Sequence, residues 1–168
     1  MIETVERNYL EILSLDDLIE SSVPQPKCSI KLVKPNEFQI NKFFYKRVGK
    51  KHRWIDRLAW SEKEWIEYFS SQKVNTYILK VIDDLAGYFE LILHPDLKEI
   101  EISYLGLLEE YHNKKLGSFL LSEAIKKSFE IKDLKRVWVH TCTLDHKNAL
   151  KNYLSRGMKI FKKETISI

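Results

Sequence analysis

The sequence predicts one α/β domain, more closely an α+β arrangement, built on a mixed and mostly antiparallel sheet with helices on both faces. Three strand-like segments at 75–82, 85–94 and 99–107 follow one another through short turns, which is typical of an antiparallel meander. A helix-spaced apolar pattern over 115–129 then leads to a strand-like segment at 136–142, and such a crossover favours a parallel pair. With 168 residues, 44% of them hydrophobic, the chain is long enough for one core and too short for two ordinary domains.

The segment before the meander divides into an extension and the start of the domain. Residues 1–20 are apolar enough to dock, as a strand followed by a short helix, and the two prolines within 21–26 indicate a linker. Alternating residues over 28–33 predict a strand. We therefore expect residues 1–26 to form an N-terminal extension and linker that packs on a domain of residues 27–168.

Capping residues indicate where several helices begin or end. Ser61 followed by Glu64 forms a capping box and predicts a helix start. Asp145 is expected to cap a later helix, and Gly157 stands where a left-handed residue ends one. The last segment, 159–168, predicts a final strand.

Composition narrows the function classes. No apolar run approaches the roughly 20 residues that span a bilayer, and the charged N-terminus does not resemble a secretory signal. The cysteines, Cys28 and Cys142, have neither a disulfide framework nor metal-ligand spacing, so we expect a cytoplasmic protein without a metal. The net charge of +4 is compatible with an anionic ligand. The segment 46–60 is basic and aromatic, as nucleic-acid-binding surfaces are, but so small a net charge argues against nucleic acid as its partner.

The segment 99–117 combines a strand, a turn and the start of a helix near Lys115. The free N–H groups and partial positive charge of a helix N-terminus can bind a phosphate. We expect Lys115 to have an ordinary φ there. A second signal lies over 145–157, where Tyr153 occurs late in another predicted helix.

These two segments carry a family resemblance. The run His112 to Gly117 corresponds to the motif Q/R-x-x-G-x-G/A, and the run Asp145 to Met158 reads D-x-x-N-A-x-x-x-Y-x-x-x-G-M. Residues 27–168, most closely 99–158, resemble the GNAT superfamily of acyl-CoA-dependent N-acyltransferases. The chain departs from the motif because Lys115 replaces the first glycine and His112 replaces the glutamine or arginine.

The resemblance implies a strand 99–107 that bulges, for which Gly106 is suited, and that splays from its neighbour to open a V-shaped slot. It implies acetyl-CoA as the co-substrate, with the pantetheine arm on the backbone near Leu107 and the pyrophosphate at the helix start. The expected cofactor-binding residues are Leu105, Leu107, His112, Asn113, Lys114, Lys115, Leu116, Gly117, Ser118 and Asn148.

The resemblance also implies catalytic roles. Tyr153 matches a tyrosine that protonates the departing thiolate, and Glu101 occupies a position where some members carry a general base. Glu90 is a second carboxylate that could face the same slot, where we expect it on the acceptor side as a substrate-binding residue or as an alternative base. For each of these residues a purely structural role, in the core or on a solvated strand face, is the alternative.

The segment 46–60 is the expected acceptor wall. Trp54, Asp56 and Arg57 could form a pocket in which Asp56 binds an ammonium group and Arg57 a carboxylate. A solvated surface anchored by tryptophans is the alternative.

The sequence thus predicts an N-acetyltransferase that transfers acetyl from acetyl-CoA to a primary amine by direct attack in a ternary complex. The acceptor is a small molecule or a peptide, and no membrane partner is expected. A non-catalytic acyl-CoA-binding regulatory module is the alternative, and a homodimer is left open. The chain ends one strand earlier than many family members, so residues 1–20 or a partner chain are candidates for the missing edge.

Overall fold

A computed structural model describes residues 2–24 and 27–167. Met1, Gln25 and Pro26 at the end of the predicted linker, and Ile168 at the end of the predicted last strand, lie outside the described residues. The strands are β1 Thr4–Ile12, β2 Cys28–Leu32, β3 Val74–Val81, β4 Asp84–His94, β5 Glu99–Leu107, β6 Arg136–Cys142 and β7 Lys159–Ser167. The α-helices are α1 Phe38–Gly49, α2 Glu62–Phe69, α3 Leu116–Ser128 and α4 Ala149–Ser155, and short 3-10 turns occupy Leu15–Asp17, Pro35–Glu37 and Glu109–Tyr111.

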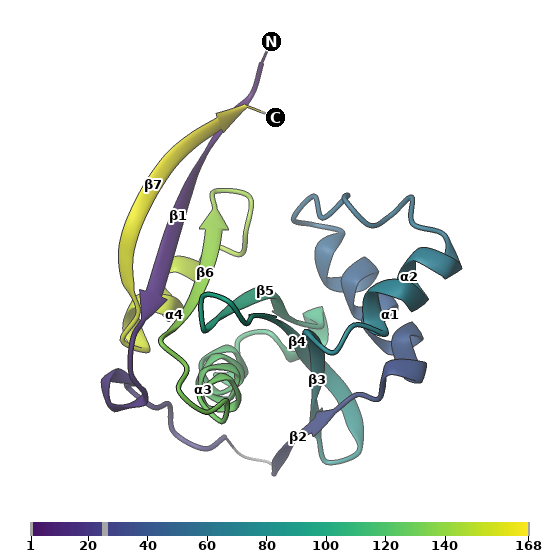
Figure 1. Ribbon diagram of the computed structural model, residues 1–168, viewed down its shortest axis with the longest axis horizontal. Helices are drawn as coiled ribbons and strands as arrows, with labels where there is room; N and C mark the ends of the chain where they lie inside the picture. Colours follow the sequence, from purple (N-terminus) through teal and green to yellow (C-terminus); the bar gives the residue numbers. More distant parts are fainter. Residues whose placement is uncertain (1, 25–26, 168) are drawn as a thin grey trace.

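The seven strands form one mixed sheet in the order β2-β3-β4-β5-β6-β1-β7 (Figure 1). The β3–β4 and β4–β5 pairs are antiparallel and joined by short turns, which confirms the predicted meander. The β5–β6 pair is parallel, with α3 as the crossover, as the sequence predicts. The predicted α/β fold with a mixed, mostly antiparallel sheet is therefore confirmed.

Helices cover both faces of the sheet, and the main core lies under α3. Leu120, Leu121, Ala124 and Ile125 recur at helical spacing and are fully buried, together with Val137 of β6. On the opposite face, α1 and α2 pack over the half of the sheet that contains β3 and β4. Among the described residues, no helix covers the β6–β1–β7 part of this face (Figure 1).

The N-terminal segment belongs to the sheet itself. β1 lies between β6 and β7 and pairs antiparallel with both, so the N-terminal residues supply an added strand. This strand is interior, which corrects the expectation that residues 1–20 could form the missing edge, because β7 is the edge strand. Leu10 and Ile12 of β1 are buried in the main core. The first part of β1 and the last part of β7 extend together past β6 (Figure 1).

Two of the three predicted helix boundaries are confirmed, and one is wrong. The Ser61–Glu64 capping box is present at the start of α2, and Gly157 has a φ of +101°, as predicted. Asp145 does not cap a helix, because α4 begins only at Ala149. Its carboxylate instead accepts hydrogen bonds from the Thr141 hydroxyl and the Cys142 N–H, which closes the turn after β6. No helix within the described residues is both long enough and apolar enough to cross a membrane.

Candidate functional site

A cleft opens where β5 and β6 separate. The two strands pair only over Glu99–Glu101 and Arg136–Trp138, although β5 continues to Leu107 and β6 to Cys142. The diverging ends border a cavity of about 1180 Å³. Its walls come from β5, β6, the start of α3, α4, the segment 52–57 and the first half of β1. The splayed strand pair implied by the resemblance is therefore present.

The sequence suggested a bulge in β5 at Gly106. The structure places it at Ser103 instead. Glu90 pairs with Tyr104 and Leu91 with Ile102, so Ser103 is the extra residue. Gly106 is needed for packing, because a Cβ atom there would lie 2.3 Å from the Cγ1 atom of Val48 in α1. The glycine thus lets α1 approach the strand that forms one wall of the cleft.

Glu90 does not line the cleft, contrary to the predicted acceptor-side role. Its side chain is fully buried, and its carboxylate forms a two-point ion pair with Arg57 at 2.7 and 2.8 Å. It also accepts hydrogen bonds from Asn41, Tyr68 and Ser103. Because Ser103 is the bulge residue, this buried network fixes the bulge from behind.

Arg57 supports the wall of the cleft through the same network. Its charge lies within 6 Å of five aromatic ring centroids, which belong to Tyr45, Trp60, Trp65, Tyr68 and Tyr104. Burial opposes the charged form, but hydrogen bonds and charge from Glu90 outweigh burial and raise the pKa of Arg57. Both terminal nitrogens of its guanidinium bind inside the protein, so Arg57 has little capacity left for the carboxylate that the sequence assigned to it.

The turn before α3 has an unusual backbone. Asn113 and Lys115 have φ values of +62° and +61°, which corrects the expectation of an ordinary φ at Lys115. Lys115 thus keeps the left-handed conformation that glycine adopts most easily, at the place of the motif's first glycine. Alternating right- and left-handed residues direct successive N–H groups into one concavity. The first N–H groups of α3 have no partner within the helix.

The predicted cofactor-binding residues gather at this end of the cleft, with one exception. Lys114 does not line the cavity, and its ammonium lies over the Tyr111 ring. At Gly117 a Cβ atom would meet only ordinary van der Waals contacts, with Asn152 Nδ2 at 3.8 Å and Leu107 Cδ1 at 3.9 Å. The residues that do line it are Leu105, Leu107, His112, Asn113, Lys115, Leu116, Gly117, Ser118 and Asn148.

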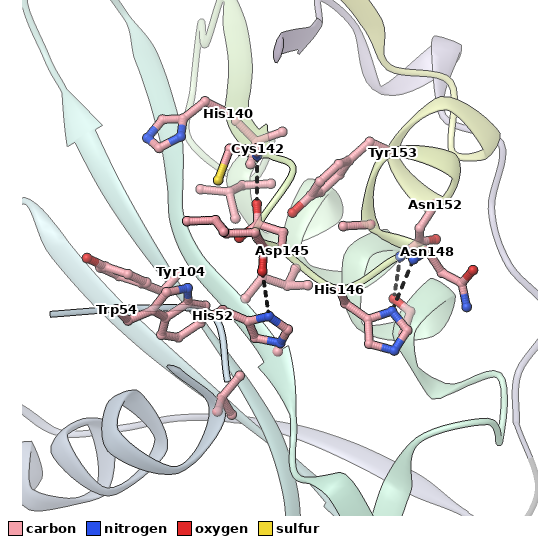
Figure 2. Close-up of a pocket in the computed structure, with 18 of the residues that line it drawn as sticks. His52, Trp54, Tyr104, His140, Cys142, Asp145, His146, Asn148, Asn152 and Tyr153 are labelled. Carbon is pink, nitrogen blue, oxygen red and sulfur yellow. Dashed lines mark hydrogen bonds between the residues drawn. The ribbon is translucent and has the colours of Figure 1, made fainter. Parts of the chain in front are cut away.

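Tyr153 projects from α4 into the cleft, toward the end of β6 (Figure 2). Only 7% of the residue is exposed. Burial, followed by the negative charge of Asp145, raises the pKa of the Tyr153 hydroxyl above its ordinary value. The phenol is therefore protonated at neutral pH and can donate its proton.

Asn152, the residue before Tyr153, connects α4 to the start of α3. Its Nδ2 group donates to the Gly117 carbonyl at 3.0 Å (Figure 2). This bond holds the tyrosine-bearing helix at a fixed place relative to the turn at 113–117. Asn148 is exposed, and its side chain makes no capping hydrogen bond at the α4 N-terminus.

Histidines contact both walls of the cleft. Nε2 of His112 and the Leu107 carbonyl are 3.2 Å apart, so the histidine that replaces the motif's glutamine or arginine binds the end of β5. The His112 and His146 rings lie 5.1 Å apart. Burial lowers the pKa of His146, and charge on His112 and His52 lowers it further. Within the described residues, no group of three or more His, Cys, Asp and Glu side chains is arranged to hold a metal ion.

The other end of the cleft has aromatic walls and a carboxylate. The Trp54 and Tyr104 rings lie side by side with centroids 4.7 Å apart (Figure 2), and Asp56 stands exposed at the rim. Glu101 lies where β5 and β6 begin to separate, with its carboxylate 3.1 Å from Nε2 of His94. All of these residues except His94 line the cavity.

The segment after α1 reaches across the cleft through two contacts. Nδ1 of His52 donates to the Leu144 carbonyl at 2.9 Å, in the loop after β6 (Figure 2). Arg53 forms an ion pair with Glu3 at 3.0 Å, next to the start of β1. The α1–α2 connection therefore touches elements on the far side of the splayed strands.

Several cleft residues were not found from the sequence: Arg7, His52, Tyr104 and Asn152. Asn152 could have been suspected because it adjoins Tyr153 on a predicted helix. Arg7 carried no signal, because nothing local places the N-terminal strand beside β6.

Solved structures resemble this fold along most of the chain. A GCN5-related N-acetyltransferase from Sphaerobacter thermophilus superimposes with a TM-score of 0.71 at 12% identity, over 99% of this chain and 52% of that one. One from Kribbella flavida gives 0.69 at 13% identity, over 99% and 58%. An aminoglycoside acetyltransferase from an uncultured soil metagenomic sample gives 0.63 at 12% identity, over 77% and 86%.

These likenesses establish the fold alone, and the chain spans little more than half the length of the first two proteins. No curated protein sequence matches the chain. Residues 38–158, which include α1, the meander, α3 and α4, match the acetyltransferase (GNAT) family. The chain belongs to the GNAT family of acetyltransferases.

Proposed function

We propose that this protein transfers the acetyl group of acetyl-CoA to a primary amine by direct attack in a ternary complex. The observation that carries the proposal is the position of Tyr153. Its protonated hydroxyl lies in the same cleft as the start of α3 and the splayed end of β5. A proton donor beside a phosphate-binding turn suits the expulsion of a thiolate from a long phosphorylated carrier.

The cleft residues fit acetyl-CoA. The turn at 113–117 offers N–H groups for the pyrophosphate, and Gly117 leaves room for its approach. The edge of β5 from Ile102 to Leu107 does not pair with β6, so its backbone is available to the amide groups of pantetheine. Bound acetyl-CoA supplies the activated acetyl group as a thioester.

We assign the general acid to Tyr153 and the general base to Glu101. The raised pKa of Tyr153 keeps its proton in place until a stronger base, the departing thiolate, develops nearby. Glu101 is the carboxylate on the cleft side of β5, whereas Glu90 is enclosed by its partners. The acceptor ammonium would lose its proton to Glu101 directly or through water.

The acceptor end suits a small molecule or an exposed peptide amine, with Trp54 as a flat wall and Asp56 at the rim. The aminoglycoside named for one structural neighbour is not assigned to this chain, since the likeness concerns the fold. The cytoplasmic location and the homodimer stay predictions.

The first experiment measures thermal unfolding with acetyl-CoA and with CoA. Ligand at 100 times its dissociation constant should add about 2.7 kcal/mol, which raises the Tm by about 5–10 °C for a domain of this size. No shift with either ligand would contradict the proposal at its first step.

The second experiment replaces Tyr153 by phenylalanine. We expect Tyr153→Phe to lower kcat roughly 10²- to 10⁴-fold while acetyl-CoA still raises the Tm, because only the proton donor is lost. Tyr77→Phe is the matched control, since Tyr77 lies on β3 outside the cleft. Full activity of Tyr153→Phe would remove the assigned role. Cofactor binding without turnover of any amine would favour the regulatory module instead.

A further inference from the structure

Arg7 of β1 lines the cleft, and its charge and that of Glu101 both act on His140 of β6. Arg7 pairs across the strands with Cys142 of β6. Because Leu10 and Ile12 of the same strand face the main core, alternation places Arg7 on the opposite face of the sheet. Its side chain is 29% exposed. The N-terminal strand therefore places a permanent positive charge beside the splayed end of β6.

The guanidinium of Arg7 is only weakly paired. Its Nε group is buried, and among the described residues it has no hydrogen-bond partner. Its contacts to the Tyr9 hydroxyl and to Glu164 are both 3.5 Å long, at the outer limit for a hydrogen bond. Glu164 already accepts a hydrogen bond from the Tyr9 hydroxyl at 2.5 Å. An incompletely paired guanidinium beside a cavity is suited to bind a planar anion.

The other arginines at this end of the cleft have close partners. Arg57 forms its two-point ion pair with Glu90, and Arg53 binds Glu3 at 3.0 Å. Of the arginines described at the acceptor end, Arg7 thus has the largest remaining capacity for a ligand. Apolar residues Val5 and Ile166 line the cavity beside it, so a bound anion there would be only partly hydrated.

An acceptor bound in the cleft would therefore have both carboxylates and a guanidinium within the same cavity. Glu101 and Asp56 are carboxylates that suit an ammonium group, Arg7 suits a carboxylate, and the Trp54 ring lies along the same cleft. We infer that the acceptor is a primary amine that also carries a carboxylate and an aromatic or apolar body, and that Arg7 binds this carboxylate. The inference rests on the proposed function and names its acceptor class.

The test compares amino acids with their carboxamides. The amino acids are L-phenylalanine, 3-amino-3-phenylpropionate and 4-(aminomethyl)benzoate, and each is paired with its own carboxamide. They are chosen because the distance between amine and carboxylate differs among the three. Turnover is measured as CoA thiol release. Calorimetry of 3-phenylpropionate and 3-phenylpropanamide measures binding without turnover, in the presence of CoA.

Three variants separate the role of Arg7 from a general charge effect. We expect wild type to prefer at least one carboxylate roughly 10- to 100-fold in kcat/KM, through a higher KM of the carboxamide, as loss of a charged hydrogen bond implies. Arg7→Gln should bring that ratio close to one, and Arg7→Lys should restore part of it. Lys162→Gln is the control, because it removes a charge from the neighbouring β7 on a residue outside the cleft.

Equal use of both members of every pair, with equal binding of the two phenylpropanoid probes, would overturn the inference. A wild-type ratio in Arg7→Gln would overturn it as well. Thermal unfolding with acetyl-CoA is measured on each variant. A retained cofactor shift with no carboxylate preference rejects the acceptor class alone, whereas a missing shift in wild type rejects the proposed function.

Discussion

At the scale of single residues, Lys115 shows a strained backbone at the site. A lysine with φ of +61° costs roughly 1–2 kcal/mol relative to a right-handed conformation, and glycine avoids that cost. We expect Lys115→Gly to stabilise the protein by about 0.5–1 kcal/mol, because relief of strain exceeds the greater entropy of glycine in the unfolded chain. Urea unfolding measures the change.

Lys114→Gly is the matched control for this prediction. Lys114 is the adjacent lysine, and its φ is not positive. Glycine there brings the entropic cost and removes the exposed contact of the ammonium with the Tyr111 ring, so we expect a loss of about 1 kcal/mol. If both variants changed stability in the same direction, strain at Lys115 would not be the cause.

At the scale of secondary-structure elements, the contact of α1 with β5 shapes the cleft wall. Because a Cβ atom at Gly106 would lie 2.3 Å from Cγ1 of Val48, Gly106→Ala forces the helix and the strand apart. We expect a destabilisation of about 1–3 kcal/mol, typical of overpacking. Thermal unfolding of the variant measures it.

Val48→Ala supplies the rescue in a double-mutant cycle. It removes Cγ1 and leaves the Val48 Cβ atom at 3.5 Å, an ordinary contact. Combined with Val48→Ala, Gly106→Ala should therefore be nearly neutral, with a coupling of about 1 kcal/mol or more. Additive losses would show that the clash does not govern this interface.

At the scale of the whole molecule, the N-terminal strand joins the edge strand β7 to the rest of the sheet. β1 bridges β6 and β7, and Leu10 is fully buried among residues of the main core. We expect Leu10→Ala to cost about 2–5 kcal/mol, the usual range for a cavity in a core. The change is measured by urea unfolding, with one cooperative transition.

Leu13, just past the end of β1, is the matched control at 56% exposure. Leu13→Ala should change stability by no more than about 0.5 kcal/mol. A small effect at both positions would mean that the strand docks as a separable extension. The division into residues 1–26 and 27–168 stays a prediction until this comparison is made.

Local signals explain what could be predicted of the site. The turn at 112–117 and Tyr153 both occur in runs of contiguous residues whose spacing matches a motif, and both line the cleft. Glu90 was misplaced because strand alternation shows which residues share a face, but not whether a helix covers that face. The sequence could not show whether Gly106 marks a bulge or a close contact with a helix, since glycine suits both. The structure places the bulge at Ser103 and the close contact at Gly106.

The sequence by itself determined the meander, the crossover through α3 and the capping box at Ser61, because periodicity and caps act between residues close in the chain. Only the tertiary structure decided that β1 inserts between β6 and β7 and that Arg7 reaches the cleft. It also decided that Arg57 encloses Glu90. These outcomes depend on pairing between residues far apart in the chain, where many registers satisfy the same local pattern and only burial in one common core selects among them.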